Sequence, residues 1–275
     1  MRLKRRPLLA GLAGVAAWPG ATRAADAAPD IARPGLQWFN VVAPLPIASL
    51  RGRVVILDFW TEGCINCIHI VPTLRRIEQR FPDRVVVIGV HSPKFQNEQD
   101  PASVASAIQR YGIRHPVVHD PKMAIWRDYQ VRGWPTLVLL DAAGAIAGRV
   151  ESEPDPDTFE RAIQALVDQA ASGGSLQPAT LALHVEAPPV RRFLFPGKLK
   201  RIMDQPRQWA LADAGHHQIV MLGNDGVEVR RIGSGTPGFK DGPAKQALFN
   251  QPQGLISDGG DVSPNPRKFR RGSRG

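Results

Sequence analysis

Apolar residues lie along the first part of the chain in long runs and helical stripes. Two runs, 54–58 (VVILD) and 85–90 (VVVIGV), are apolar without alternation, which is typical of parallel strands buried on both faces. Between them, residues 65–81 carry apolar side chains at helical spacing. The other predicted elements are strands at 117–119, 136–140 and 145–150 and helices at 103–111, 123–129 and 156–171, the last capped by Asp157. The order β-α-β-α-β-α-β-β-α predicts an α/β sandwich with a parallel half and an antiparallel edge.

The pattern changes after residue 171. Residues 172–190 (SGGSLQPATLALHVEAPPV) are typical of a linker, and helical periodicity is lost beyond them. Short strands separated by turns rich in Gly, Asn and Asp are expected at 210–213, 218–222 and 227–232. This pattern of short strands and tight turns predicts one blade of a β-propeller within 191–258. Residues 259–275 are polar and basic with no strand pattern, so we expect a disordered tail there.

The formal net charge of +10 is confined to the two ends of the chain. Residues 1–24 hold five basic residues and no acid, and 267–275 hold five more basic residues, so the body between them is neutral. Charge in two tails does not make a basic binding face. We therefore expect no nucleic-acid partner.

The N-terminal segment, 1–24 (MRLKRRPLLAGLAGVAAWPGATRA), has a basic start, an apolar run and then small residues. This order is typical of a secretory signal peptide, with cleavage expected after Ala24 or Ala27. Arg5-Arg6 also resembles a twin-arginine export signal, and an uncleaved N-terminal anchor is the alternative. Export predicts a periplasmic or secreted protein, in a compartment where thiols tend to oxidise.

Cys64 and Cys67 are the two cysteines of the chain, and they lie between the first long strand and the first helix. Unpaired N–H groups and the helix dipole stabilise a thiolate at a helix N-terminus. Two intervening residues let the second sulfur reach the first within one helical turn. The pair is therefore predicted to cycle between dithiol and disulfide.

Two alternatives to redox cycling are metal binding and a purely structural disulfide. Cys64, Cys67 and His69 supply three ligands, whereas zinc takes four and no second cysteine pair exists. The sequence CINCIH also misses the haem-attachment spacing CxxCH by one residue. A disulfide that closes so short a loop adds little stability. We expect no metal and no cofactor.

The stretch from Asp58 to Cys67 (DFWTEGCINC) resembles the DFWAxWCxxC segment of thioredoxins. Pro72, five residues after Cys67, matches the proline of the thioredoxin active-site helix. Trp134-Pro135-Thr136 matches the family's cis-proline element before a long strand. The resemblance covers residues 36–171 and implies a thioredoxin-like fold.

The same resemblance implies a role for each matching residue. Cys64 would be the attacking thiolate, Cys67 the resolving thiol and Asp58 a buried acid that moves the proton of Cys67. Pro135 would be a cis-proline in the substrate-docking groove. Three further residues would flank the substrate there: Trp60, Trp134 and Thr136. Two departures, Gly63 in place of an aromatic residue and Ile65-Asn66 in place of Gly-Pro, leave the reduction potential and the choice of partner open.

The second region resembles an NHL β-propeller repeat, on the residues 195–198 (FPGK) and 212–220 (ADAGHHQIV). A thioredoxin-like module followed by such repeats resembles the NHL repeat-containing protein 2 family. A propeller closes with about four to eight blades, whereas this pattern supplies one blade and the start of another. Our hypothesis is a truncated relative of a longer propeller protein.

The predicted function is that of an exported thiol–disulfide oxidoreductase with a disulfide-containing protein as substrate. A reductase in the periplasm would need a membrane thiol-transfer protein as electron donor, whereas an oxidase would run the same steps backwards. The alternative is a binding scaffold built on a thioredoxin fold with idle cysteines and a remnant propeller.

Overall fold

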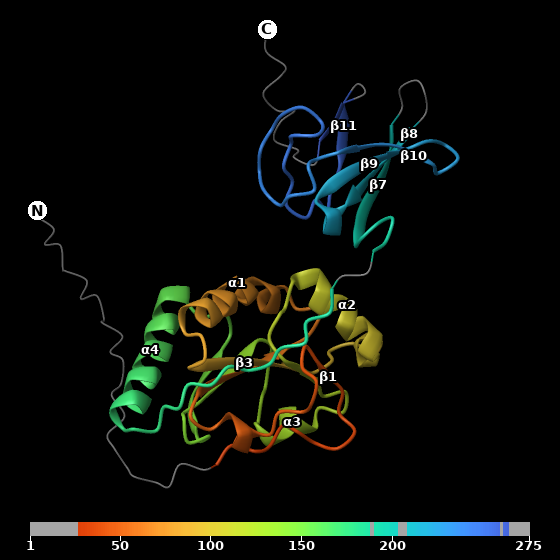
Figure 1. The fold of residues 1–275 in the computed structure, drawn as a ribbon. Helices are drawn as coiled ribbons and strands as arrows, with labels where there is room; N and C mark the ends of the chain where they lie inside the picture. The colour runs from red at the N-terminus through yellow and green to blue at the C-terminus, as the bar shows by residue number, and fades with distance from the viewer. Residues whose placement is uncertain (1–26, 188–189, 203–207, 259–260, 264–275) are drawn as a thin grey trace, which may run out of the picture. The chain divides into compact units, whose positions relative to one another are not determined.

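The computed structural model describes residues 27–187, 190–202, 208–258 and 261–263 (Figure 1). The predicted signal segment and residues 264–275 of the predicted tail lie outside these ranges. The chain divides into two compact units, one of residues 1–98 with 115–183 and one of residues 99–114 with 184–275. Among the described residues, no helix has the length and apolar character needed to cross a bilayer.

The first unit is built on a six-stranded sheet in the order β1-β4-β3-β2-β5-β6. Strands β2, β3 and β4 run parallel, β5 and β6 continue the sheet antiparallel, and β1 pairs antiparallel with β4. The predicted parallel half and antiparallel edge are therefore confirmed. The strands are β1 (Trp38–Phe39), β2 (Val54–Trp60), β3 (Val85–His91), β4 (Val117–His119), β5 (Thr136–Leu140) and β6 (Ile146–Glu151).

All the predicted helices are present, with ends that differ by one or two residues. They are α1 (Ile65–Arg80), α3 (Ala124–Asp128) and α4 (Pro156–Ser172) of the first unit and α2 (Pro101–Tyr111), whose residues belong to the second. Short 3-10 turns lie at Ile47–Leu50 and Gln96–Gln99. The predicted cap of α4 is wrong: Asp155, not Asp157, accepts the N–H of Thr158 at 2.9 Å. Pro156 at the first helical position has no N–H to satisfy, so the cap stands before it.

Helices α1 and α4 lie on one side of this sheet and α3 on the other (Figure 1), and buried apolar side chains fill both layers. Val55, Leu57 and Phe59 of β2 pack with α3, whereas Val54 and Ile56 pack with α1 and α4. Successive side chains of a strand point to opposite faces. Asp58 therefore shares the face that α1 covers.

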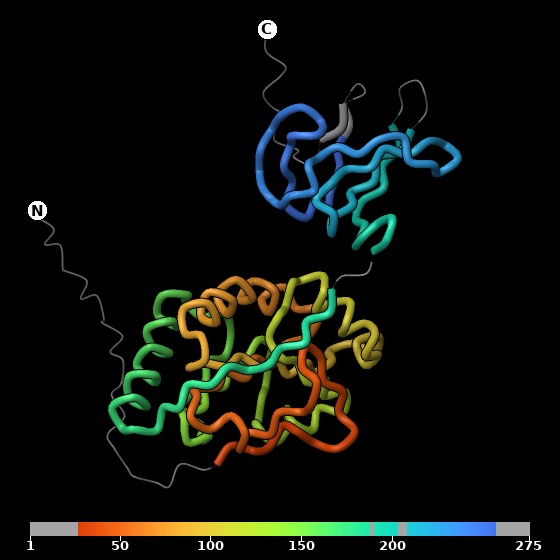
Figure 2. The backbone as a smooth tube through the Cα atoms, in the orientation of Figure 1, coloured from red at the N-terminus to blue at the C-terminus, as the bar shows by residue number. Residues whose placement is uncertain are grey.

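The second unit contains a four-stranded antiparallel sheet in the order β10-β9-β8-β7, the arrangement of one propeller blade (Figure 2). The predicted all-β character of this segment is confirmed. Its strands are β7 (Pro196–Ile202), β8 (Gln208–Asp213), β9 (Gln218–Leu222) and β10 (Glu228–Ile232), with a short turn at Ala214–His216. Strand β7 was not predicted, because most of its side chains are exposed and show no apolar pattern.

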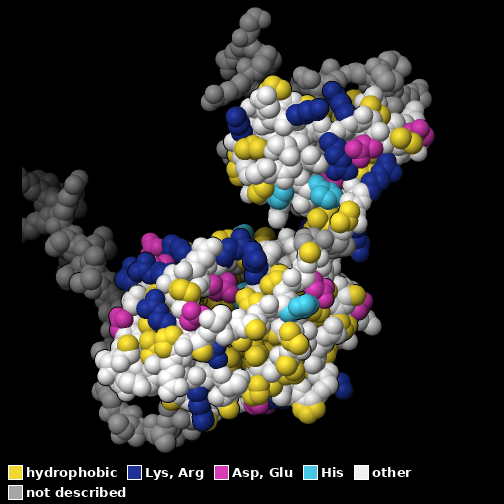
Figure 3. All heavy atoms as spheres, viewed as in Figure 1, with side chains coloured by type: hydrophobic (Ala, Val, Ile, Leu, Met, Phe, Trp, Pro, Cys, Tyr) yellow, Lys and Arg dark blue, Asp and Glu magenta, His cyan; other side chains and the backbone are white. Residues whose placement is uncertain are grey.

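A further strand pair lies beyond the blade, where the sequence predicted none. Strand β11 (Ile256–Asp258) pairs antiparallel with β12 (Asp261–Ser263). On the face drawn in Figure 3, basic and acidic side chains of the described residues lie interspersed.

Candidate functional site

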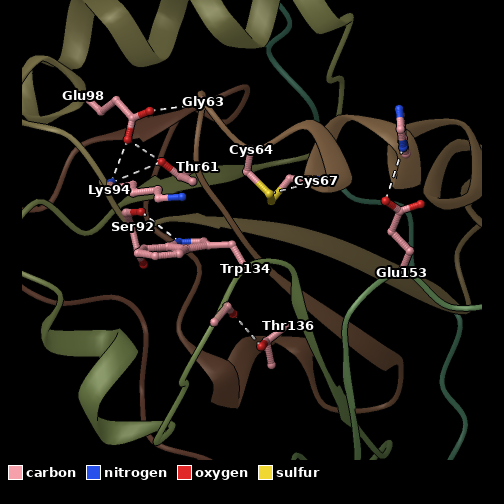
Figure 4. Close-up of a disulfide and its surroundings, with 12 residues drawn as sticks. Thr61, Gly63, Cys64, Cys67, Ser92, Lys94, Glu98, Trp134, Thr136 and Glu153 are labelled. Atoms are coloured by element: carbon pink, nitrogen blue, oxygen red, sulfur yellow. Dashed lines mark hydrogen bonds and ion pairs between the residues drawn. A yellow bond between two sulfur atoms is a disulfide. The ribbon is translucent and has the colours of Figure 1, made fainter.

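The two cysteines form a disulfide where β2 passes into α1 (Figure 4). Cys64 is the N-cap residue of α1, and its sulfur accepts the N–H of Cys67 at 3.2 Å. Cys67 is buried, with 2% of its surface exposed, whereas Cys64 is half-buried. Cys64 is therefore the sulfur that a second molecule can reach.

The loop before β5 is drawn among the surroundings of this disulfide in Figure 4. Trp134 and Pro135 are joined by a cis peptide bond, as the resemblance implied. Trp134 donates from Nε1 to the carbonyl oxygen of Ser92 at 3.0 Å, and in Figure 4 its side chain extends toward that residue. Thr136 is buried and donates its hydroxyl to the carbonyl of Gly133 at 2.8 Å. Thr136 thus fixes the loop, while Trp134 and the backbone form its partly exposed surface.

Asp58 lies buried on the α1 face of the sheet, the face that also buries Cys67 in the first turn of that helix. Burial raises the pKa of Asp58 to about 7, and the charge of His115 offsets part of this rise. Among the described residues, the Oδ1 atom of Asp58 has no hydrogen-bond partner. A carboxyl in this setting gains and loses a proton near neutral pH, as a proton carrier must.

Glu98 is a residue of the site that the sequence did not reveal. It is 1% exposed, and its carboxylate accepts N–H groups of Gly63 at 2.8 Å and Lys94 at 2.7 Å and the hydroxyl of Thr61 (Figure 4). Burial raises the pKa of Glu98, but these hydrogen bonds outweigh burial and hold it below its usual range. The ionised carboxylate ties the loop before Cys64 to the segment after β3. An acid within the turn-like stretch 92–101 carries no sequence signal for such a role.

Trp60, another predicted substrate contact, is 2% exposed and meets the ring of His91 edge-on, with ring centroids 4.8 Å apart. His91 in turn lies 3.1 Å from His119, measured between their Nδ1 atoms. Burial first, and His119 second, lower the pKa of His91 to about 3, so His91 is neutral at physiological pH. Trp60 and this histidine pair are packing groups behind the redox loop.

His69, weighed as a metal ligand with the cysteines, pairs with Glu153 at the surface. Its Nδ1 atom lies 3.2 Å from Oε1 of Glu153, and both side chains are largely exposed. Within the part of the chain that the structure describes, no three His, Cys, Asp or Glu side chains group as metal ligands would.

Comparison with known proteins gives a match to a family model described as thioredoxin-like over residues 52–146. NHL repeat-containing protein 2 of Gallus gallus is 35% identical over 232 residues, which are 82% of this chain and 32% of that protein. Protein SUPPRESSOR OF QUENCHING 1, chloroplastic, of Arabidopsis thaliana is 36% identical over 80% of this chain and 21% of its own length. A solved thioredoxin-like superfamily protein is 27% identical, with a TM-score of 0.48 over 51% of this chain and 96% of its own.

The chain thus spans about a third or less of the length of these curated relatives. The matched residues include the Cys64–Cys67 disulfide at the β2–α1 junction and the cis Trp134–Pro135 bond. Residues 52–146 are therefore a thioredoxin-like domain, and the chain is similar, over most of its length, to NHL repeat-containing protein 2.

Proposed function

We propose that this protein is a thiol–disulfide oxidoreductase that acts on disulfide bonds of other polypeptides. The observation that carries the proposal is the asymmetry of the cysteine pair: Cys64 is half-buried and Cys67 is buried at the start of the same helix. One sulfur is open to a partner, and the other reaches only its neighbour.

In the reducing direction, the Cys64 thiolate attacks one sulfur of a substrate disulfide. A mixed disulfide forms, and the second substrate sulfur leaves as a thiolate. Cys67 then loses its proton to Asp58 and attacks the sulfur of Cys64, which releases the substrate cysteine. The disulfide of Figure 4 is the oxidised product of this cycle.

Two features of the site support the roles of these residues. Cys64 caps α1, so the unpaired N–H groups and the dipole of the helix stabilise its thiolate. Asp58 lies on the same face of the sheet as Cys67 and has a pKa of about 7. It is therefore suited to accept a proton at neutral pH and to return it in the oxidising direction.

Export is part of the proposal and rests on the basic-apolar-small pattern of residues 1–24. An exported reductase would take electrons from a membrane thiol-transfer protein, since each cycle leaves the pair oxidised. Mass spectrometry of the protein from fractionated cells should find it outside the cytoplasm and lacking the first 24 to 27 residues. Full-length protein in the cytoplasm would contradict export without touching the redox chemistry.

Insulin reduction in the presence of dithiothreitol tests the activity. Wild-type protein should accelerate precipitation of the insulin B chain, and Cys64→Ser should lower the rate to the background set by dithiothreitol alone. Val42→Ala, at a residue 84% exposed, is the matched control and should keep full activity. Equal rates for wild type and Cys64→Ser would favour a scaffold with idle cysteines.

A further inference from the structure

Phe95 lies against the residue that precedes the nucleophile. A Cβ atom at Gly63 would stand 3.0 Å from Cε2 of Phe95 and 3.1 Å from Oε1 of Glu98. The ring and the carboxylate therefore occupy the space of a Gly63 side chain. This contact explains the glycine at a position where the thioredoxin pattern has an aromatic residue: the aromatic group here comes from the segment after β3.

The position of Phe95 is fixed by the buried carboxylate of Glu98. That carboxylate accepts the backbone N–H of Phe95 at 3.2 Å and that of Gly63 at 2.8 Å. It also accepts the N–H of Lys94 at 2.7 Å (Figure 4). One charged group thus binds both the Phe95 segment and the loop of Cys64. The backbone of Phe95 is therefore fixed where its ring contacts Gly63, the residue before Cys64.

Despite this fixed position, the Phe95 side chain is 52% exposed. Ile65, on the other side of Cys64 in the sequence, is 60% exposed. Large apolar groups are usually buried, and exposed aromatic side chains on a rigid support are typical anchors of protein contacts. Cys64 therefore lies between two residues associated with exposed apolar groups: Ile65, which follows it, and Gly63, which the Phe95 ring contacts.

We propose that Phe95 is a specificity-determining residue that contacts an apolar side chain next to the reactive cysteine of a polypeptide substrate. Glu98 is the positioning residue that binds the backbone of Phe95 and of Gly63, and so holds this ring against the residue before Cys64. The inference rests on the proposed thiol–disulfide exchange and deepens it, because it names the kind of disulfide that the site prefers. Substrates with apolar neighbours react faster than those with polar neighbours, whereas small disulfides gain nothing from the ring.

The test compares three disulfides: two peptide disulfides that differ only in Leu or Ser beside the cysteine, and 5,5′-dithiobis(2-nitrobenzoate). Full-length wild-type protein, reduced beforehand and used in a single turnover, should prefer the Leu peptide about tenfold in the second-order rate constant, which corresponds to about 1.4 kcal/mol. Phe95→Ala should cut this preference to about twofold, chiefly by raising the peptide concentration that gives half the maximal single-turnover rate, as expected for loss of an aromatic anchor. Its rate with the small disulfide should stay within about twofold of wild type, because no ring contact is lost there.

Two variants complete the design. Phe95→Leu keeps an apolar group and should keep most of the preference. Val42→Ala removes an exposed apolar group that follows β1. Because β1 runs antiparallel to β4, this group lies at the opposite end of the strands from Cys64, and the variant should behave as wild type.

Two results would overturn the inference. One is an unchanged preference in Phe95→Ala, and the other is an equal loss on all three disulfides, which would mean that the ring acts on the cysteine pair itself. Wild-type protein that reduces none of the three would instead overturn the proposed function, on which the inference rests.

Discussion

The two units use buried carboxylates in opposite ways. In the second unit, Asp213 is fully buried and accepts the N–H of Leu194 at 2.7 Å, and its Oδ2 lies 2.9 Å from Nη1 of Arg231 and 2.8 Å from Nδ1 of His216. In the first unit, Asp58 is equally buried, yet its Oδ1 has no hydrogen-bond partner among the described residues. A satisfied buried acid holds a structure together, whereas an unsatisfied one costs stability. The buried carboxylate of the blade is therefore structural, whereas Asp58 fits the proton-transfer role that we propose for it.

The apolar cores of the two units also differ: the sheet of the first unit is buried on both faces, whereas the blade is partly exposed. Every residue of β2 and β3 is buried, because helices cover the sheet. In the blade, most of β7 and part of β10 are exposed, and the buried clusters on the two faces are small. A sheet enclosed on both faces holds its strand ends rigidly. The redox pair stands at such a strand end.

Replacing each carboxylate by its amide should give stability changes of opposite sign. The pKa of Asp58 is raised in the folded state, so folding binds a proton between about pH 4 and pH 7, and wild-type stability falls as pH rises through this window. The rise in the pKa of Asp58 corresponds to at most about 4 kcal/mol of lost stability at high pH. Asp58→Asn should therefore stabilise the first unit by about 2 kcal/mol at pH 8, and by much less at pH 5. Asp213→Asn should destabilise the second unit by about 2 kcal/mol at both pH values, because the charged hydrogen bonds to the buried carboxylate are weakened while Arg231 keeps Glu228 as its other partner.

Urea titrations read by pulsed hydrogen exchange would assign each change to its unit. An Asp58→Asn effect that is the same at pH 5 and pH 8 would contradict the proton assignment. A stabilising Asp213→Asn would contradict the structural one.

A matched pair of isoleucines measures the difference between the cores. Ile77 of α1 is 0% exposed and Ile219 of β9 is 1% exposed, so equal side chains are removed from equal burial. Ile77→Ala should cost about 4 kcal/mol, because the covered sheet cannot collapse around the cavity. Ile219→Ala should cost about 2 kcal/mol, because a small cluster relaxes more readily. The same urea titration reports both values, and equal costs would mean that the blade packs as tightly as the redox unit.

The sequence predicted well where local pattern decides structure. Continuous apolar runs predicted β2, β3 and β5, and helical spacing predicted α1. The family motifs identified Cys64 and the cis bond before Pro135.

Prediction from the sequence failed where contacts between residues far apart in the chain decide the structure. Glu98 binds Thr61 across 37 positions, and no periodic pattern encodes such a contact. Strands β1 and β7 were missed because one is two residues long and the other is largely exposed. The cap of α4 was predicted at Asp157 but is Asp155, because Pro156 takes the first helical position.

The central claim is that Cys64 attacks a substrate disulfide and Cys67 resolves the product. Trapping the mixed disulfide tests it most directly. Reduced Cys67→Ser protein, incubated with insulin, should accumulate a covalent adduct through Cys64 that dithiothreitol releases, since the resolving thiol is missing. Cys64→Ser, which keeps only the buried Cys67, should form at least about tenfold less adduct, because burial blocks attack. Equal adduct from the two variants, or none from Cys67→Ser, would contradict the account.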